Sequence, residues 1–341
     1  MTKKDFWNKS TIAVMGGGSW GTALAQIAAQ NCGEVRVWVR DDDQAREMNS
    51  NRVNPDYLPD LKLNPKIKAL SSLERVFEPK VQAVIWALPS SVCREQARNL
   101  AHYFKGDEVI LHATKGIEQG SLKRISEILT EELPTRRIGV ISGPNLADEI
   151  ARGEPAGTVV ASAFEEVIDA GVSLLTTSRF RVYPGHDVIG VEWAGTLKNI
   201  LAISAGALDE MKMGWNSRSM MITRGLHEMV RFGVAMGANP STFLGLAGIG
   251  DLLATCSSPL SRNYRVGQQL AQGKPIGEIL KELGNTAEGV RTTETVHEFA
   301  KKNKIDMPIT AAVHRLLQAN VSVEQVLQDL MSRPAGDDTI T

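Results

Sequence analysis

Cysteine is scarce in this sequence, an excess of either charge is missing, and each absence excludes a class of protein. The 341 residues contain three cysteines, Cys32, Cys93 and Cys256, which are too few and too scattered for a disulfide framework or a zinc ribbon. The 38 basic residues nearly equal the 39 acidic ones, and a net charge of −1 provides no electrostatic basis for binding nucleic acid or an anionic membrane. We therefore expect a protein of the reducing cytoplasm that has no nucleic-acid partner.

Signals for membranes and metals are missing as well. No run of 18 apolar residues occurs, so we expect no membrane insertion. No apolar stretch follows the lysines near the N-terminus, so no signal peptide is expected. The six histidines are dispersed, and His227-Glu228 lacks the second histidine of a zinc-binding helix. We therefore predict that no metal is bound.

The order of the apolar segments predicts two domains. Short apolar runs typical of strands in a parallel sheet alternate with helix-length stretches in the first half of the chain. They are Thr11–Met15, Val35–Val39, Val81–Leu88, Val109–Ala113, Ile138–Ile141, Thr158–Ala161 and Phe180–Tyr183. From Gly190 onward we find only helical periodicity. We predict an α/β Rossmann-type domain with a doubly wound, mostly parallel sheet over 1–190, an all-α domain over 191–335 and a polar tail over 336–341.

A glycine-rich turn directly follows the first predicted strand. Residues 16–21 read Gly-Gly-Gly-Ser-Trp-Gly, which matches G-x-G-x-x-G before a helix. In that pattern Gly16 permits the tight turn, Gly18 lets the backbone approach a pyrophosphate, and Gly21 lets the helix pack against the strand. Amide groups at the start of the helix would then face the phosphates. The turn predicts nucleotide binding, and a purely structural glycine turn is the alternative.

The end of the second predicted strand bears on the choice of cofactor. Arg40 occupies the first loop position and is followed by three aspartates, Asp41, Asp42 and Asp43. An acidic residue here binds the ribose hydroxyl of NAD, whereas an arginine accommodates the 2′-phosphate of NADP. We expect NADP to be slightly preferred over NAD. The alternative is that Arg40 is a solvated loop charge.

Two lysines are placed where chemistry is expected. Lys115 follows the strand Val109–Ala113 at the carboxyl edge of the sheet, where ligands bind in open α/β sheets. Lys198 and Asn199 lie in an apolar helix over 192–207, and a buried lysine with a lowered pKa can act as a general base. The alternatives are a loop charge for Lys115 and a lysine that reaches solvent at the helix edge for Lys198.

Polar residues in the second half suit a phosphate. Ser261, Arg262 and Asn263 offer a hydroxyl, a guanidinium and an amide at adjacent positions. Asp251 follows a Gly-x-Gly turn, and the alternative to a functional role is that it serves only as a helix N-cap. Cys256 has no base nearby in the sequence, which favours a buried structural cysteine over a nucleophile.

Seven blocks of the chain together resemble bacterial NAD(P)-dependent glycerol-3-phosphate dehydrogenase. They occur in family order over most of the chain, at Gly16–Thr22, Thr114–Gly116, Ser142–Pro144, Leu197–Asn199, Gly250–Leu252, Ser261–Asn263 and Ala287–Arg291. Two positions depart from the pattern, Leu146 where an aromatic residue is common and Thr286 where valine is common. Both departures lie on the cofactor side.

The resemblance implies the residues of a composite site. On the cofactor side it implies Gly16, Gly18, Ser19, Trp20, Gly21, Arg40, Lys115, Ala147, Arg262, Thr286 and Glu288. On the substrate side it implies Lys115, Gly143, Asn145, Lys198, Asp251, Ser261, Arg262 and Asn263. Lys198 would be the proton acceptor. As a hypothesis, Lys115 and Asn199 polarise the carbonyl oxygen, while Asp251 and Thr255 orient Lys198.

The resemblance also implies a reaction, the reversible NAD(P)H-dependent reduction of dihydroxyacetone phosphate to sn-glycerol 3-phosphate for phospholipid synthesis. We accordingly expect a small phosphorylated substrate and, since twofold dimers are the commonest oligomers, a homodimer. A β-hydroxyacid dehydrogenase of the 6-phosphogluconate dehydrogenase type is one alternative, and the Ser261–Asn263 block and Lys115 argue against it. A non-catalytic dinucleotide sensor is another, and the combination of two lysines with Arg262 argues against it.

Overall fold

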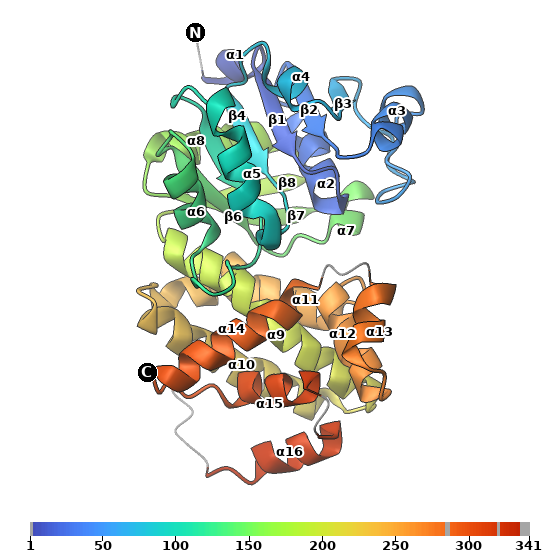
Figure 1. Cartoon of the computed structure of the whole chain (residues 1–341), viewed down its shortest axis with the longest axis vertical. Helices are drawn as coiled ribbons and strands as arrows, with labels where there is room; N and C mark the ends of the chain where they lie inside the picture. Colours follow the sequence, from blue (N-terminus) through green and yellow to red (C-terminus); the bar gives the residue numbers. More distant parts are fainter. Residues whose placement is uncertain (1–2, 284–286, 319–320, 335–341) are drawn as a thin grey trace. The chain divides into compact units, whose positions relative to one another are not determined.

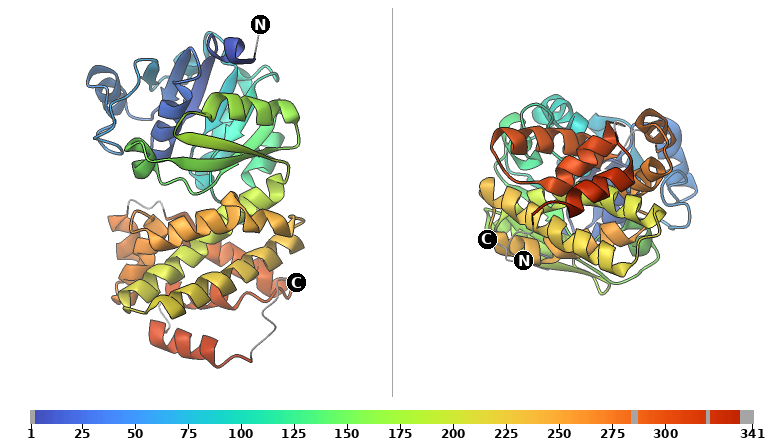
Figure 2. Two further views of the ribbon diagram at one scale, coloured as in Figure 1. Left: turned by 180° about the vertical axis from the view of Figure 1, so that it is seen from behind. Right: turned by 90° about the horizontal axis from the view of Figure 1, so that it is seen from below.

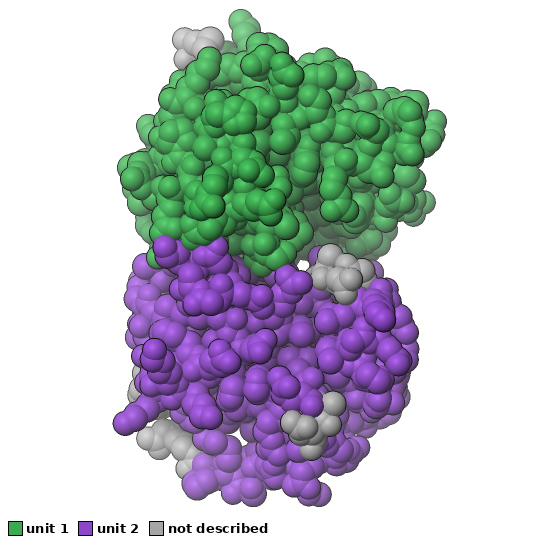
Figure 3. Space-filling view, in the orientation of Figure 1, with its two compact units in different colours: residues 1–114, 125–188 green, residues 115–124, 189–341 purple. Residues whose placement is uncertain are grey.

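The structure is a computed structural model that describes residues 3–283, 287–318 and 321–334. The described residues form two compact units (Figure 3), unit 1 from those up to 114 and from 125 to 188, and unit 2 from those at 115–124 and from 189 on. The segment 115–124, which we expected within the first domain, packs in unit 2 because Ile117 is buried in the helical core. The expected tail over 336–341 lies outside the described residues.

Unit 1 is built on one sheet (Figure 1). Among the described residues its strands are β1 (Thr11–Met15), β2 (Glu34–Trp38), β3 (Ile67–Leu70), β4 (Ala83–Trp86), β5 (Val109–His112), β6 (Ile138–Ser142), β7 (Ala156–Ser162) and β8 (Phe180–Gly185). Their order is β3-β2-β1-β4-β5-β6-β7-β8, and neighbours are parallel except for the antiparallel pair β6 and β7. The first six follow the order of a dinucleotide-binding sheet, so the predicted Rossmann-type fold is confirmed.

The strand β3 was not predicted from the sequence. Its four residues, Ile67–Leu70, alternate between buried and exposed positions, and Lys68 faces solvent. The strand lies at the edge of the sheet beside β2, where only half of its side chains have a core to enter. An edge strand of this kind lacks the continuous apolar run that marks a strand buried on both faces.

Both faces of the sheet are covered by helices (Figure 2). Along β1, Ile12 and Val14 enter the core beneath α2 (Ser19–Ala28) and α8 (Glu165–Leu175), whereas Ala13 and Met15 enter the core beneath α5 (Cys93–Leu100) and α6 (Ile125–Glu132). The two burial directions explain why the central strands read as unbroken apolar runs. The other described helices of unit 1 are α1 (Lys3–Trp7), α3 (Asp42–Ser50), α4 (Leu73–Phe77) and α7 (Ala147–Ala151), with short 3₁₀ turns at Ser90–Val92 and Ala101–Tyr103.

Unit 2 is helical, and no strand occurs among its described residues. Its core forms around α9 (Val188–Glu210), a helix of small and apolar residues that is buried along most of its length. The other described helices are α10 (Trp215–Ala235), α11 (Asp251–Ser257), α12 (Arg262–Ala271), α13 (Ile276–Glu282), α14 (Glu288–Lys302), α15 (Pro308–Leu317) and α16 (Val323–Met331). A 3₁₀ turn over Pro240–Leu244 and a π-helical turn over Leu246–Gly250 precede α11. The predicted all-α half is therefore confirmed.

A buried glutamate joins two helices of unit 2. The Glu228 carboxylate on α10 accepts hydrogen bonds from the backbone amides of Ile309 and Thr310 and from the Thr310 hydroxyl. These amides belong to the first turn of α15, where no intrahelical acceptor exists. Burial raises the pKa of Glu228 to about 7, although all three donors oppose that rise. Glu228 thus caps α15 from a neighbouring helix.

Removing this carboxylate should destabilise unit 2. Glu228→Ala leaves three donors without an acceptor, and at about 1 kcal/mol each we expect a loss of about 3 kcal/mol in the free energy of unfolding. Because the folded pKa is raised, the contribution of Glu228 is fully present below the ordinary glutamate pKa and is lost as pH rises to about 7. Urea unfolding at several pH values should show that the free energy of unfolding of the wild type falls as the pH rises to about 7. This fall should be absent in Glu228→Ala and present in the matched surface variant Glu294→Ala.

Candidate active site

Three charged residues of unit 2 meet in one hydrogen-bonded cluster. The Lys198 ammonium donates to Asp251 Oδ1 at 2.5 Å and to Thr255 Oγ1 at 2.6 Å. The Lys115 ammonium donates to the other oxygen of the same carboxylate, Asp251 Oδ2, at 2.6 Å. The side chains of Lys198, Asp251 and Lys115 are 7%, 2% and 19% exposed, so Lys115 has the most access to solvent. The structure therefore brings together four of the five expected catalytic residues.

The helix α11 presents Asp251 and Thr255 on one face. Residues four apart in a helix lie one above the other, so both side chains reach Lys198 on α9. Asp251 is the first residue of α11, yet its carboxylate makes no capping hydrogen bond there. The alternative reading of Asp251 as no more than an N-cap is therefore wrong, because two ammonium groups take both of its oxygens. The preceding π-helical turn is a feature often found at functional sites.

Burial and charge tune the acidity of Lys198. Burial lowers its pKa to about 8, the Asp251 carboxylate opposes that change, and the Lys115 charge adds to it. An amine with this pKa gives up and regains a proton close to neutral pH, as a general acid–base group requires. On the same helix as Asp251, burial raises the pKa of Cys256 to about 12, so its thiol stays protonated. Cys256 is buried, as we expected of a structural cysteine.

The expected substrate residue Asn263 joins α12 to α14, and α14 also packs closely on α9. Asn263 Oδ1 accepts a hydrogen bond from the Gly289 amide at 3.0 Å. A Cβ at Gly289 would lie 2.7 Å from the Asn199 carbonyl oxygen, so only glycine permits this approach. The Asn199 amide makes a long hydrogen bond of 3.5 Å to the Gly195 carbonyl within α9. The glycine of the Ala-Glu-Gly block is thus explained by helix packing beside Lys198.

Three further expected residues lie at helix starts. Ser261 caps α12, and its hydroxyl accepts a hydrogen bond from the Tyr264 amide at 3.3 Å. Arg262 is the first residue of α12 and is exposed, whereas Glu288 is the first residue of α14 and is half-buried. Thr286, which we expected on the cofactor side, lies outside the described residues.

The glycine turn of unit 1 has the geometry of a phosphate cradle. Gly16 adopts a φ of +113°, and a Cβ at Gly21 would lie 1.9 Å from the Gly16 carbonyl oxygen. Beside Gly18 the space is open, since the nearest atom to a Cβ there would be a Tyr57 ring carbon at 3.9 Å. Gly18 is the N-cap of α2, and no side chain caps the first-turn amides, which include those of Ser19 and Trp20. The turn therefore leaves room and hydrogen-bond donors for a pyrophosphate.

Asn54 holds this turn and was missed by sequence reasoning. Its fully buried amide donates to the Gly17 carbonyl and to Thr22 Oγ1, both at 2.8 Å. The Gln44 amide donates to the same Gly17 carbonyl at 3.1 Å. Asn54 lies between α3 and β3 in a polar stretch without periodicity, so no sequence signal marks it as buried.

Beyond β2, the acidic residues are engaged locally. Asp41 caps α3 by accepting from the amides of Asp43 and Gln44 at 2.7 and 3.1 Å. Asp43 forms an ion pair with Arg46. Arg40 is exposed and makes no hydrogen bond or ion pair with the described residues. Its guanidinium is therefore available to a ligand, whereas the carboxylate of Asp41 serves the helix.

The end of β6 carries three further expected residues. Gly143 packs on the next strand, since a Cβ there would lie 2.9 Å from Thr158 Cα. The Asn145 amide donates to the Gly157 carbonyl at 3.0 Å, and its oxygen accepts from the Thr158 hydroxyl at 2.8 Å. Ala147 begins α7 and is half-buried. β7 thus fixes the orientation of Asn145, and the roles of all three residues in ligand binding stay predictions.

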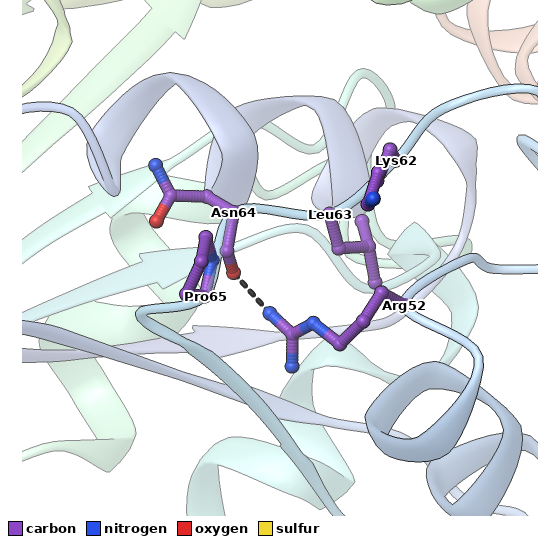
Figure 4. A pocket seen from close by; sticks show the side chains of 5 residues that line it. All are labelled: Arg52, Lys62, Leu63, Asn64 and Pro65. Carbon is purple, nitrogen blue, oxygen red and sulfur yellow. Dashed lines mark hydrogen bonds between the residues drawn. The ribbon is translucent and has the colours of Figure 1, made fainter.

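One surface cavity of unit 1 contains none of the expected residues. It has a volume of about 560 Å³ and is lined by Arg52, Lys62, Leu63, Asn64 and Pro65 (Figure 4). The Arg52 guanidinium donates to the backbone carbonyls of Asn64 and Ile67, so it braces the loop before β3. We assign no ligand to this cavity.

The described residues show no sign of a metal centre or of a membrane span. No group of three or more histidine, cysteine, aspartate or glutamate side chains in the described ranges could hold a metal ion. None of the described helices is long and apolar enough to cross a bilayer.

Comparisons with known proteins identify the family. The model of the NAD-dependent glycerol-3-phosphate dehydrogenase N-terminus matches residues 11–168, and that of the C-terminus matches residues 187–328. Glycerol-3-phosphate dehydrogenase [NAD(P)+] of Leuconostoc mesenteroides is 46% identical over 95% of this chain and 98% of its own length. Its counterpart from Pseudomonas paraeruginosa is 48% identical over 94% of each chain.

A solved structure has the same fold over nearly the whole chain. Glycerol-3-phosphate dehydrogenase of Coxiella burnetii superposes with a TM-score of 0.89 at 38% identity, covering 95% of this chain and 99% of its own. Both halves of the chain match the family models, and full-length relatives exceed 40% identity. The chain therefore belongs to the NAD-dependent glycerol-3-phosphate dehydrogenase family.

Proposed function

We propose that this protein catalyses the reversible reduction of dihydroxyacetone phosphate to sn-glycerol 3-phosphate with NADPH or NADH. The observation that carries the proposal is the shared Asp251 carboxylate, which holds two lysine ammonium groups in a buried cluster. The full-length relatives named for this activity support it. They also favour this reaction over that of a 6-phosphogluconate-type dehydrogenase and over a non-catalytic sensor.

Lys198 supplies the proton of the reduction. The dinucleotide, when bound, supplies a hydride to the ketone carbon, and the carbonyl oxygen then needs a proton. The Lys198 ammonium donates that proton to the oxygen and recovers it from solvent, and in the oxidation the neutral amine takes the hydroxyl proton. Asp251 and Thr255 orient the amine through their two short hydrogen bonds.

The charge that develops on the carbonyl oxygen is stabilised by nearby donors. Lys115 is more exposed than Lys198 and keeps its ammonium within the cluster, so it can polarise the oxygen. The long hydrogen bond of the Asn199 amide leaves that group able to turn toward the same oxygen. We assign the phosphate to the start of α12, where Arg262 presents an exposed guanidinium between Ser261 and Asn263.

The direct test is the oxidation of NADPH and then of NADH in the presence of dihydroxyacetone phosphate, followed by absorbance. We expect turnover with this substrate and none with the 3-oxo acids that a β-hydroxyacid dehydrogenase of the 6-phosphogluconate dehydrogenase type would reduce. Turnover only of the latter would contradict the proposal. Binding of dinucleotide without turnover of any keto phosphate would instead indicate a sensor.

The cellular setting follows from the same proposal. The product is the backbone of glycerophospholipids, and both substrates are small and diffusible, which fits a cytoplasmic enzyme. We also propose a homodimer, since twofold dimers are the commonest assemblies of soluble proteins. Sedimentation of the purified protein tests this state.

Arg40 should set the cofactor preference. Its unpaired guanidinium can take the 2′-phosphate of NADP in a charge-assisted contact worth about 1.5–3 kcal/mol. Arg40→Ala should therefore weaken NADPH binding by about tenfold or more while leaving NADH binding within about twofold. Titration of both dinucleotides by fluorescence measures the ratio. Arg46→Ala, which removes a nearby exposed arginine, is the control, and an unchanged ratio in Arg40→Ala would reject the role.

A further inference from the structure

We infer that the buried Arg124–Glu192 ion pair positions Lys115 for catalysis by anchoring the segment 115–124 to the helix that carries Lys198. The inference rests on the proposed function, since it gives these two residues a part in the same reaction. Neither residue touches the substrate site by the assignments above, so both are positioning residues.

The segment 115–124 is a short closed loop. Ile117 and Arg124 pair in an antiparallel bridge, the Glu118 amide donates to the Lys123 carbonyl at 2.9 Å, and the Leu122 amide donates to the Glu118 carbonyl at 3.1 Å. These bonds bring the backbone of Arg124 beside Ile117. A force that holds Arg124 therefore also holds the backbone two residues from Lys115.

Ion pairs hold both ends of the segment against helices of unit 2. The Arg124 guanidinium lies 2.6 Å from Glu192 Oε2, and these side chains are 15% and 4% exposed. At the other end, the Lys115 ammonium lies 2.6 Å from Asp251 Oδ2. Between the two pairs, Ile117 is buried in the helical core. The Lys115–Asp251 pair is part of the reactive cluster, whereas the Arg124–Glu192 pair lies outside it and can anchor the segment throughout the reaction.

The Arg124–Glu192 pair attaches the segment to α9, the helix that carries Lys198. Glu192 precedes Lys198 by six residues on α9, a rise of about 9 Å along the helix axis. Anchoring Arg124 to Glu192 thus sets the segment, and with it Lys115, at a fixed place relative to Lys198. Two ammonium groups that share one carboxylate repel each other, so without an anchor Lys115 would tend to move outward.

This arrangement has a measurable electrostatic consequence. The titratable or charged groups that face Lys198 are Asp251 and Cys256 from α11 and Lys115 from the segment. Cys256 stays neutral, Asp251 raises the pKa of Lys198, and Lys115 lowers it. If Lys115 withdraws, the pKa of Lys198 must rise. The pH at which reduction loses activity then moves upward, and loss of folded protein alone would not produce that shift.

The experiment compares wild type, Arg124→Met and Glu192→Gln, with Arg315→Met as control. Arg315 forms an ion pair of the same chemistry with Asp329, between α15 and α16. Amide hydrogen exchange of the peptide covering 115–124 measures the anchoring without any assumption about the reaction. We expect exchange at the amides of Glu118 and Leu122 to accelerate by about tenfold or more in both test variants.

Kinetics then measure the consequence for catalysis. With dihydroxyacetone phosphate and NADPH, both test variants should lose about tenfold in kcat. They should also shift the alkaline fall of kcat to a higher pH by about half a pH unit or more. Arg124→Lys should restore part of each effect. Glu192→Gln, which preserves side-chain volume, decides the matter if Arg124→Met does not fold.

The outcomes separate the inference from the proposed function. Unchanged exchange in Arg124→Met and Glu192→Gln would overturn the anchoring role. Faster amide exchange in the segment 115–124 with an unchanged pH dependence of kcat would overturn the positioning role. If the wild type fails to reduce dihydroxyacetone phosphate, the proposed function fails, whereas the exchange measurement still decides whether the pair anchors the segment.

Discussion

Lys198→Met should lower kcat for dihydroxyacetone phosphate reduction by roughly 10²–10⁴-fold, the usual contribution of a positioned acid–base group. Methionine fills the volume of the buried lysine side chain but can neither donate nor accept a proton. Binding of NADPH should stay within about twofold of wild type, because Lys198 is not among the residues expected on the cofactor side. Lys301→Met, at an exposed lysine of α14, is the matched control. Turnover close to wild type in Lys198→Met would reject the assignment of this residue.

The same lysine predicts the pH dependence of both directions. Reduction requires the ammonium form, so its kcat should fall as pH rises through about 8, the pKa that burial imposes on Lys198. Oxidation of sn-glycerol 3-phosphate requires the neutral amine, so its kcat should rise through the same pH range. Initial rates in both directions between neutral and alkaline pH measure the fall of one kcat and the rise of the other. If the two changes occur at unrelated pH values, another group moves the proton.

The second large effect is expected from Asp251→Asn. The substitution keeps the shape of the side chain but removes the charge that holds Lys115 and Lys198. Misplacing the reactive groups by about 1 Å can cost about 10²-fold, so we expect at least that loss in kcat. Without the carboxylate, burial and the Lys115 charge act unopposed, and the pKa of Lys198 falls. The alkaline limb of reduction should therefore move to lower pH, opposite to the shift expected for Arg124→Met.

Stability must be measured alongside this activity. Breaking a buried ion pair by removing one partner destabilises proteins by about 3–5 kcal/mol, so Asp251→Asn should also unfold at lower urea concentration. Asp329→Asn removes a carboxylate from an exposed pair and is the control for both measurements. An Asp251→Asn protein that is folded and whose kcat profile keeps its alkaline limb in place would contradict the role of Asp251.

The local sequence was sufficient for features that depend on neighbouring residues. The glycine turn at Gly16–Gly21 lies between β1 and α2, as its pattern predicted. The pattern is recognisable because a tight turn and close helix packing restrict its key positions to glycine. The central strands were recognisable because both of their faces are buried. The strand β3 was not predicted because an edge strand buries only alternate side chains, and four residues are too few to establish that alternation.

Hydrogen-bond and ion-pair partners that are distant in the sequence could not be predicted from local patterns. Asp251 looked like a helix cap because the nearest amides are those of its own helix, whereas in the folded chain two lysines 136 and 53 residues away take its oxygens. Asn54 and the Arg124–Glu192 pair had no sequence signal at all. Their burial depends on which segments pack over them, and no local pattern encodes that.

The scarcity of cysteine, the balanced charge and the spacing of glycines and apolar runs by themselves determined the class of this protein, a two-domain chain with a Rossmann-type half and a helical half. Only the tertiary structure decided the reactive arrangement. It assigned the segment 115–124 to the helical unit and placed Lys115 and Lys198 on one carboxylate. The physical reason is that backbone propensity acts over a few residues, whereas burial and ion pairing act between side chains that become neighbours only when the chain folds.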